Sequence, residues 1–270
     1  MTIIRSTLSA MVLAVALGGC DLDREPLLVG GKQSPEDRIV AELIAELADA
    51  EGIPVQRRIG LGGSRLTMEA LKRGEINLYP EYTGSGLALL GLAQPADADP
   101  DSAIELLRER YGPLGLSWSE PLGFESSPGL AMLRERARAL DVRSYSDLAP
   151  YTDRLVIGVD SEFRGRPIDG LGPLGRRYGI DFQRVLEVPT RDRSQLYELL
   201  MDGEIDVALV HSADPQIEIF DLKVLADDRE FFPPHAAAVV YREAALQRYP
   251  ALEGILAKLE GAIGDPRSRS

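Results

Sequence analysis

The chain has 270 residues, of which 43 are acidic and 30 basic, and its formal net charge is −13 at pH 7. This charge argues against nucleic acid or an anionic membrane face as partner, and it mildly favours a cationic or zwitterionic ligand. The composition, 44% hydrophobic with 6% aromatic residues, is ordinary for an α/β protein of one large domain or two lobes.

The first residues have the pattern of a targeting segment. Residues 1–19 predict a secretory signal, in which Arg5 supplies the positive charge and residues 11–17 form an apolar run too short to span a bilayer. Small residues then precede Cys20, the only cysteine, as in a lipobox. We therefore expect Cys20 to be lipidated, with an ordinary signal peptide as the alternative. Asp21 resembles the residue that keeps lipoproteins in the inner membrane of enteric-type Gram-negative bacteria, so we expect the periplasmic face of that membrane. In a Gram-positive host the expected location is the cell surface.

Strand and helix patterns then alternate along the chain. The predicted strands are 27–29, 55–59, 76–79, 115–119, 155–159, 185–188, 205–210 and 237–241. One predicted helix begins at Ser34–Pro35 and ends at Gly52. Others cover 64–71, 102–111, 194–201 and 252–263, a short one starts at 146–148, and another ends at Tyr178. Such alternation predicts an α/β fold with largely parallel sheets.

Residues 74–86 stand out within this pattern. A helix ends at Gly74 and a buried strand follows at 76–79. Pro80 lacks a backbone donor, and Gly84 and Gly86 permit unusual backbone conformations, so we expect the strand to give way to an irregular loop. No helix pattern follows, which argues against a nucleophile elbow. Tyrosines, a carboxylate and hydroxyls would then lie where open sheets bind ligands.

Several kinds of chemistry are not supported. Walker, Rossmann, Gly-x-Ser-x-Gly and His-Glu-x-x-His patterns are absent, so we expect neither an enzyme nor a bound cofactor. A zinc site built from His211, His235 and carboxylates is the alternative interpretation of the two histidines. The turns at Lys32 and at residues 62–64 each precede a helix, where free N–H groups can bind an anion; a plain tight turn is the alternative.

Two motifs carry a family resemblance. The segments Leu61-Gly62-Gly63-Ser64 to Lys72 and Leu78-Tyr79-Pro80-Glu81-Tyr82-Thr83-Gly84 look like the signature of glycine betaine/choline/carnitine-binding proteins of ABC importers. Gly30-Gly31-Lys32 and the 160–167 loop resemble the same family. The resemblance implies a two-lobed, type II periplasmic-binding-protein fold. Lobe 1 would comprise residues 27–124 and lobe 2 residues 125–228, and residues 229–270 would return to lobe 1 after the tether at 20–26. The chain ends sooner than such proteins usually do.

The resemblance also implies a site. A quaternary ammonium is held over aromatic faces, each contributing about 0.5–2 kcal/mol, and a carboxylate is held by cations and donors. The positions that match the family are Lys32, Ser85 and Arg166 for the carboxylate and Tyr82 for the aromatic box. Three positions differ, because Pro128, His211 and His235 stand where the family has tyrosine. The alternatives are a solvated Lys32, an ion-paired Arg166, a core Tyr82 and exposed loop histidines.

We therefore expect a monomeric, lipid-anchored solute-binding protein that delivers a small zwitterion of the betaine, choline or carnitine type to an ABC permease and its ATPase. One alternative is a different carboxylate-bearing or amphiphilic solute. Another is a non-transport lipoprotein that interacts or senses. If the histidines line the site, affinity should change between about pH 5.5 and 7.5.

Overall fold

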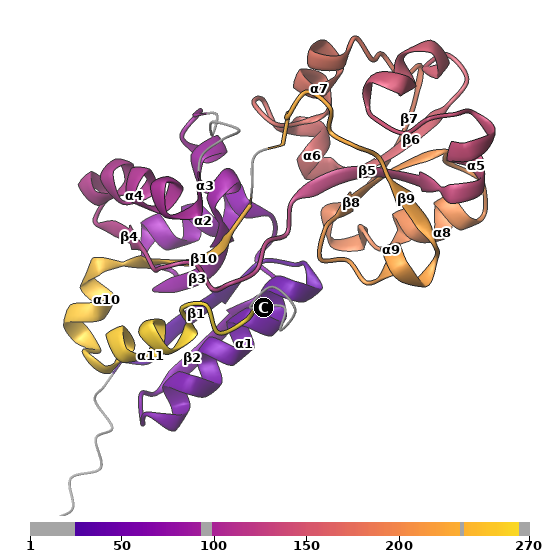
Figure 1. The fold of residues 1–270 in the computed structure, drawn as a ribbon. Helices are drawn as coiled ribbons and strands as arrows, with labels where there is room; N and C mark the ends of the chain where they lie inside the picture. The colour runs from indigo at the N-terminus through magenta and orange to yellow at the C-terminus, as the bar shows by residue number, and fades with distance from the viewer. Residues whose placement is uncertain (1–24, 93–98, 233–234, 265–270) are drawn as a thin grey trace, which may run out of the picture.

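The computed structural model describes residues 25–92, 99–232 and 235–264, and it consists of two lobes joined by two crossing segments (Figure 1). Each lobe is built on one five-stranded sheet. The predicted signal segment and Cys20 lie outside the described residues. Among the helices of the described residues, none is long and apolar enough to cross a membrane.

The lobe 1 sheet has the strand order β2-β1-β3-β10-β4. Its strands are β1 (Leu27–Gly31), β2 (Val55–Ile59), β3 (Leu78–Tyr82), β4 (Leu116–Trp118) and β10 (Ala237–Arg242). Its helices are α1 (Pro35–Ala50), α2 (Ser64–Arg73), α3 (Thr83–Leu89), α4 (Pro100–Tyr111), α10 (Glu243–Arg248) and α11 (Ala251–Leu259). Strands β1, β2 and β3 are parallel, whereas β10 is antiparallel to β3 and β4 because it belongs to the returning chain.

The lobe 2 sheet has the order β7-β6-β8-β5-β9. Its strands are β5 (Pro128–Leu133), β6 (Val156–Asp160), β7 (Arg184–Val188), β8 (Val207–His211) and β9 (Leu222–Val224). Its helices are α5 (Arg134–Ala139), α6 (Ser161–Gly165), α7 (Leu171–Tyr178), α8 (Gln195–Met201) and α9 (Gln216–Ile219). Short 3₁₀ turns cover Gly112–Leu114 in lobe 1, and Ser146–Tyr151 and Thr190–Asp192 in lobe 2. The predicted two-lobed α/β fold is confirmed.

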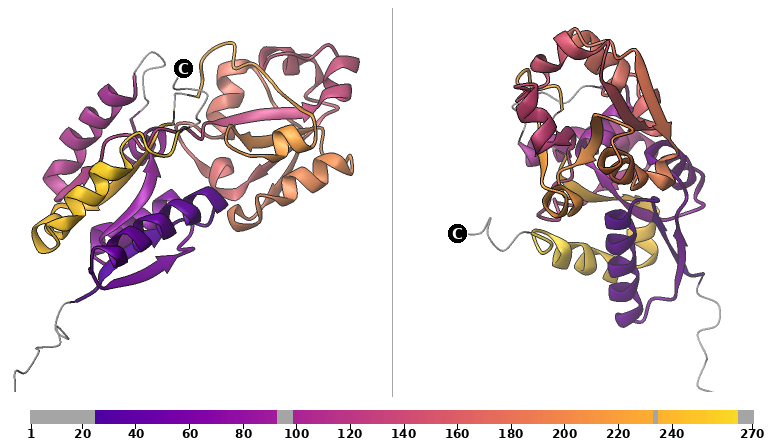
Figure 2. Two further views of the ribbon diagram at one scale, coloured as in Figure 1. Left: turned by 60° about the horizontal axis from the view of Figure 1, so that its bottom comes forward. Right: turned by 90° about the vertical axis from the view of Figure 1, so that its right-hand side faces the viewer.

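Helices cover both faces of the lobe 1 sheet, and the strand periodicity of two distributes the side chains between them (Figure 2). Along β3, Leu78 and Tyr82 pack in the cluster that includes α1 and α11, whereas Tyr79 packs in the cluster that includes α2 and α4. Both faces being buried explains why β3 has no exposed residue. Lobe 2 is organised around a single large cluster.

The prediction of an irregular loop after Tyr79 is wrong. Strand β3 runs through Pro80 to Tyr82, and helix α3 begins at Thr83. Pro80 is tolerated because its neighbour across the ladder, Val239, bonds to Ser119 instead. The N–H of Val239 donates to the hydroxyl of Ser119, and its carbonyl accepts from the N–H of Ser119, at 2.9 Å each. The argument against a nucleophile elbow from a missing helix therefore fails as well.

The glycines of α3 allow aromatic rings to approach the helix closely. A Cβ at Gly84 would lie 2.5 Å from the imidazole of His235, and one at Gly86 would lie 2.5 Å from the indole of Trp118. Both distances are too short for a real contact, so the two glycines serve packing and not loop flexibility. This close packing seats the start of α3 directly beside the returning chain.

The two crossing segments pair with each other between the lobes. Glu125 forms an isolated antiparallel bridge with Ala236, and the N–H of Ala237 donates to the carbonyl of Phe124 at 3.0 Å. The N–H of His235 donates to the hydroxyl of Ser127 at 3.2 Å. Two short paired segments form a hinge about which the lobes can close on a ligand.

The packing of Gly86 leads to a stability prediction. Gly86→Ala should lower the free energy of unfolding by about 1–3 kcal/mol, because the added methyl group overpacks against Trp118 and Leu107. Gly112→Ala is the matched control, since a Cβ there meets nothing within 4 Å, and it should be neutral or slightly stabilising. Urea titrations of both variants measure the difference. Equal stabilities would contradict the close packing.

Candidate functional site

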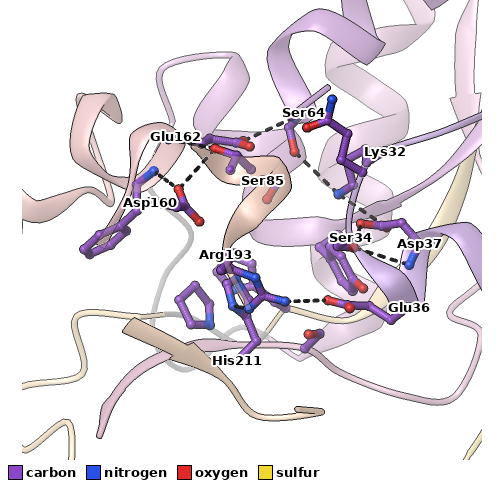
Figure 3. Close-up of a pocket in the computed structure, with 18 of the residues that line it drawn as sticks. Lys32, Ser34, Glu36, Asp37, Ser64, Ser85, Asp160, Glu162, Arg193 and His211 are labelled. Carbon is purple, nitrogen blue, oxygen red and sulfur yellow. Dashed lines mark hydrogen bonds and ion pairs between the residues drawn. The ribbon is translucent and has the colours of Figure 1, made fainter. Parts of the chain in front are cut away.

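A pocket lies between the lobes, beside the hinge. All six residues that the sequence assigned to the ligand line it, namely Lys32, Tyr82 and Ser85 from lobe 1, Arg166 and His211 from lobe 2, and His235 from the crossing segment. Pro128 lines it too. Figure 3 shows these elements converging from both lobes on one space. Side chains distant in sequence are thus brought to the edge where the carboxyl ends of β1, β3, β6 and β8 meet.

Lys32 lies on the lobe 1 side of the pocket in a buried ion pair. It is only 6% exposed, and its Nζ donates to Oε1 of Glu81 at 2.5 Å. Nζ also lies 4.5 Å from the centre of the Tyr82 ring, which is a cation–π contact. Burial alone would lower the pKa of Lys32, but the carboxylates of Asp37 and Glu81 outweigh it and raise that pKa. Lys32 is therefore charged and already paired within the protein.

Asp37 is the second carboxylate beside Lys32. It lies in the first turn of α1 and is 3% exposed, and its Oδ1 is 3.6 Å from Nζ of Lys32. Its Oδ2 accepts from the hydroxyl of Ser34, the N-cap residue, whereas Oδ1 accepts no hydrogen bond. Burial raises the pKa of Asp37 to about 7, Lys32 opposes the rise, and the charge of Glu81 adds to it. Asp37 is thus ion-paired with Lys32 but keeps one buried oxygen without a hydrogen bond.

The predicted anion-binding turn at residues 62–64 holds an anion supplied by lobe 2. The N–H of Ser64, the first residue of α2, donates to Oε1 of Glu162 at 3.2 Å. A Cβ at Gly63 would lie 2.0 Å from the same carboxylate, so only glycine leaves room for it. Burial opposes ionisation of Glu162, but Arg166 and Lys32 outweigh it and lower the pKa of that carboxyl. Glu162 thus links the two lobes at a helix N-terminus.

Arg166 is also paired. Its guanidinium donates to Glu162 at 3.1 Å, to Asp169 at 3.0 Å and, across the lobes, to the hydroxyl of Ser85 at 3.1 Å. Burial would lower its pKa, but Asp169 and Glu162 raise it. The structure therefore brings Arg166 and Ser85 together, as the family pattern implies, with a carboxylate of the protein in contact with the cation.

A third cation, Arg193, comes from lobe 2. It donates to both oxygens of Asp214, at 3.0 and 3.2 Å, and its NH2 lies 3.5 Å from Glu36 of lobe 1. It also contacts Nδ1 of His211. Burial, followed by the charge of Arg193, lowers the pKa of His211 well below its ordinary value, so this imidazole is neutral at physiological pH. Its titration cannot produce the affinity change expected between about pH 5.5 and 7.5.

His235 packs between lobe 1 and the hinge. It is 1% exposed, with its ring against Gly84 of α3, so it is a buried pocket residue and not an exposed loop histidine. Together with Pro128 and His211 it replaces aromatic faces by smaller or saturated rings. Of the described pocket residues only Tyr82 and Phe163 carry six-membered aromatic rings.

Sequence reasoning missed several charged residues of the pocket. None of the following was predicted to line the site: Asp37, Glu81, Glu162, Arg193 and Asp214. Glu81 and Glu162 both lie inside the family motifs. A charged residue within a motif predicted to be buried was therefore the signal that could have identified these two as pocket residues. Arg193 and Asp214 lie outside any motif, and only the fold brings them together. Among the described residues, no group of three or more His, Cys, Asp or Glu side chains is arranged to hold a metal ion.

The comparisons with known proteins agree with this geometry. Residues 25–266 match the family model OpuAC, described as the substrate binding domain of ABC-type glycine betaine transport systems. The chain belongs to this family. Its members are solute-binding proteins of ABC transporters and not enzymes.

Two relatives and one solved structure illustrate the similarity. The chain is 32% identical over 246 residues to the ergothioneine transport permease/ergothioneine binding protein EgtU of Helicobacter pylori, covering 90% of this chain but only 43% of that protein. It is 34% identical over 236 residues to a glycine-betaine-binding protein of Pseudomonas aeruginosa, covering 84% and 74% of the two chains. The crystal structure of a glycine betaine/carnitine/choline ABC transporter protein superposes with a TM-score of 0.67 at 29% identity, covering 88% of each chain.

The raised pKa of Asp37 predicts a pH-dependent stability. The folded state retains a proton on Asp37 up to about pH 7, whereas the unfolded chain loses it at about pH 4. The contribution of Asp37 to stability is therefore lost as pH rises through about 7. Asp37→Asn cannot ionise, so its stability relative to wild type should increase by roughly 2–3 kcal/mol between about pH 5 and pH 8.

Urea titrations at several pH values measure this difference. Asp49→Asn on the same helix is the matched control, because the side chain of Asp49 is 43% exposed. A stability difference that is independent of pH for both variants would contradict the burial of an excess charge at Asp37.

Proposed function

We propose that this protein is the lipid-anchored receptor of an ABC importer, and that it binds a small zwitterion with a cationic nitrogen, of the betaine or carnitine type, between its lobes. The observation that carries the proposal is the convergence of six residues, predicted from five separate segments, on one pocket beside a two-segment hinge. Lipidation would occur at Cys20 and would hold the protein at the membrane face where the permease and ATPase subunits act.

The two ends of the ligand would be held by different parts of the pocket. The carboxylate would lie near Arg166, Ser85 and the N-terminus of α2, where hydrogen-bond donors from both lobes converge. The cationic nitrogen would lie toward Tyr82, whose ring already has a cation over its face. The relatives named for glycine betaine and ergothioneine support a ligand of this class.

Calorimetry on a matched pair of variants tests this function. Wild-type protein should bind at least one of glycine betaine, carnitine, choline and ergothioneine at millimolar concentration or below. Tyr82→Leu removes the aromatic face and should weaken binding about fivefold to thirtyfold, since one face contributes about 1–2 kcal/mol when desolvated. Tyr82→Phe keeps the face and should bind nearly as wild type. Wild-type protein that binds none of the four compounds would sink the proposal.

The position of Glu162 gives a separate prediction. A ligand carboxylate that uses Arg166 and the N–H of Ser64 must compete with the carboxylate of Glu162 for both. Glu162→Gln removes that competing charge and should tighten glycine betaine about tenfold, which corresponds to about 1.4 kcal/mol. Choline has no carboxylate and should be unaffected.

Asp169→Asn is the control for this experiment. It removes the other carboxylate on Arg166 but leaves Glu162 at the N-terminus of α2, so it should not tighten glycine betaine. Equal effects of both variants on both ligands would show that Glu162 acts through net charge alone and not by occupying the carboxylate position.

A further inference from the structure

The pocket contains a buried serine whose hydroxyl is not bonded within the described part of the chain. Ser126 lies in the first crossing segment, lines the pocket and is 1% exposed. Burial raises the pKa of Tyr82, and the hydroxyl of Ser126, which lies beside that of Tyr82, opposes the rise. The Ser126 hydroxyl nevertheless makes no hydrogen bond of ordinary geometry with a described residue. A buried hydroxyl without a partner is costly, so a ligand group that bonds to it gains more than the bond alone.

The main chain holds Ser126 in place without using its hydroxyl. The N–H of Ser126 donates to the carbonyl of His235 at 3.1 Å. The next residue, Ser127, donates its N–H to the hydroxyl of Ser212 at 3.0 Å and accepts from the N–H of Ser212 at 2.9 Å. The side chain of Ser126 is therefore fixed at the pocket wall, and its hydroxyl can rotate to donate to a ligand or to accept from it.

His211 lies near Ser126 on the same wall of the pocket. His211 of β8 pairs with Pro128 of β5, so Ser126, two residues before Pro128, is a diagonal neighbour of His211. Nδ1 of His211 accepts from Arg193, which can only donate, so the proton of this imidazole is on Nε2. Among the described residues, none accepts from Nε2. His211 thus offers the pocket an uncharged N–H donor.

The charges behind this wall favour a neutral ligand group. Arg193, in contact with His211, would repel a second cation. Asp214 and Glu36, which pair with Arg193 at 3.0 and 3.5 Å, would repel a second anion. A hydroxyl or a ring heteroatom carries no net charge, and it can accept from both Nε2 of His211 and the hydroxyl of Ser126.

We propose that the ligand is a betaine that carries a neutral polar group in addition to its quaternary ammonium and its carboxylate, and that Ser126 and His211 bind this group. The group lies near the ammonium, because the hydroxyl of Ser126 is beside the ring that would hold the ammonium, that of Tyr82. This inference rests on the proposed function, since it concerns the ligand of the same pocket. Ser126 and His211 are accordingly specificity-determining residues that select among betaines.

Two pairs of betaines test the proposal on the wild-type protein by calorimetry. Carnitine and γ-butyrobetaine differ only in the hydroxyl of carnitine. The trimethylated betaines of histidine and phenylalanine differ in whether the ring carries nitrogen atoms. In at least one pair the member with the extra polar group should bind about tenfold more tightly, because its analogue leaves both donors without a partner. Equal affinities within both pairs would overturn the proposal.

Substitution of Ser126 supplies the second arm. Ser126→Ala should weaken the polar member of the pair more than its analogue, and so lower the ratio of the two affinities about threefold or more. Ser146→Ala is the matched control, because Ser146 also has a buried hydroxyl without a partner but lies in the 3₁₀ turn of lobe 2, outside the pocket lining. It should leave the ratio unchanged. A ratio that Ser126→Ala does not lower would overturn the proposal.

Substitution of His211 supplies the third arm. His211→Phe removes the Nε2 donor but keeps a planar ring at the end of β8. It should lower the same ratio, and the variant that combines it with Ser126→Ala should bind both members of the pair equally. Equal weakening of both members by His211→Phe would show that the ring only shapes the wall, which overturns the proposal.

The outcomes separate this inference from the proposed function. Discrimination within a pair that Ser126→Ala and His211→Phe both lower supports the inference. Binding of the betaines without discrimination overturns the inference and leaves the proposed function standing. Wild-type protein that binds none of these betaines, nor glycine betaine, choline or ergothioneine, overturns both.

Discussion

The pocket depends on the buried ion pair between Lys32 and Glu81. Glu81 is fully buried at the carboxyl end of β3, and it joins the ammonium of Lys32 to the backbone of Tyr82 and the hydroxyl of Tyr79. Removing one member of such a pair typically costs about 3–5 kcal/mol, because the other charge stays buried without compensation. The pair fixes Lys32 over the ring of Tyr82 and so sets both the charge and the shape of the lobe 1 wall.

Charged and polar side chains also pair with one another across the two lobes. Glu162 reaches from lobe 2 to the N-terminus of α2, Arg166 reaches Ser85, and Arg193 reaches Glu36. These contacts are polar, so water and ligand groups can replace them at modest cost, unlike an apolar interface of the same size. Paired charges at the lobe interface, together with a hinge of two short backbone segments, suit a protein that must close on a solute and release it.

The fold was predictable because strand and helix periods are strong where both faces of a sheet are buried. The buried strand predicted at 155–159 and the N-cap Ser34 with Pro35 follow directly from local patterns. The helix at Thr83–Leu89 was not predictable, because its glycines serve the packing of His235 and Trp118, which lie far away in sequence. The six residues predicted to bind the ligand, all of which line the pocket, followed from the family motifs. The pairing of Lys32 with Glu81 depends on how two strands align in space, which no local pattern encodes.

The replacement of aromatic residues changes how lobe 2 can contribute to binding. Neutral His211 accepts from Arg193, which Asp214 holds in place, so this wall of the pocket is a hydrogen-bonded polar network and not a π face. Attraction to an aromatic face does not depend on the direction of an N–H, whereas a hydrogen bond to a carboxylate or an imidazole does. A wall built of such polar groups therefore contacts a ligand through directional hydrogen bonds more than through an aromatic face. The fold is shared with the family, whereas the wall that lobe 2 contributes to the pocket is built from charged and polar side chains.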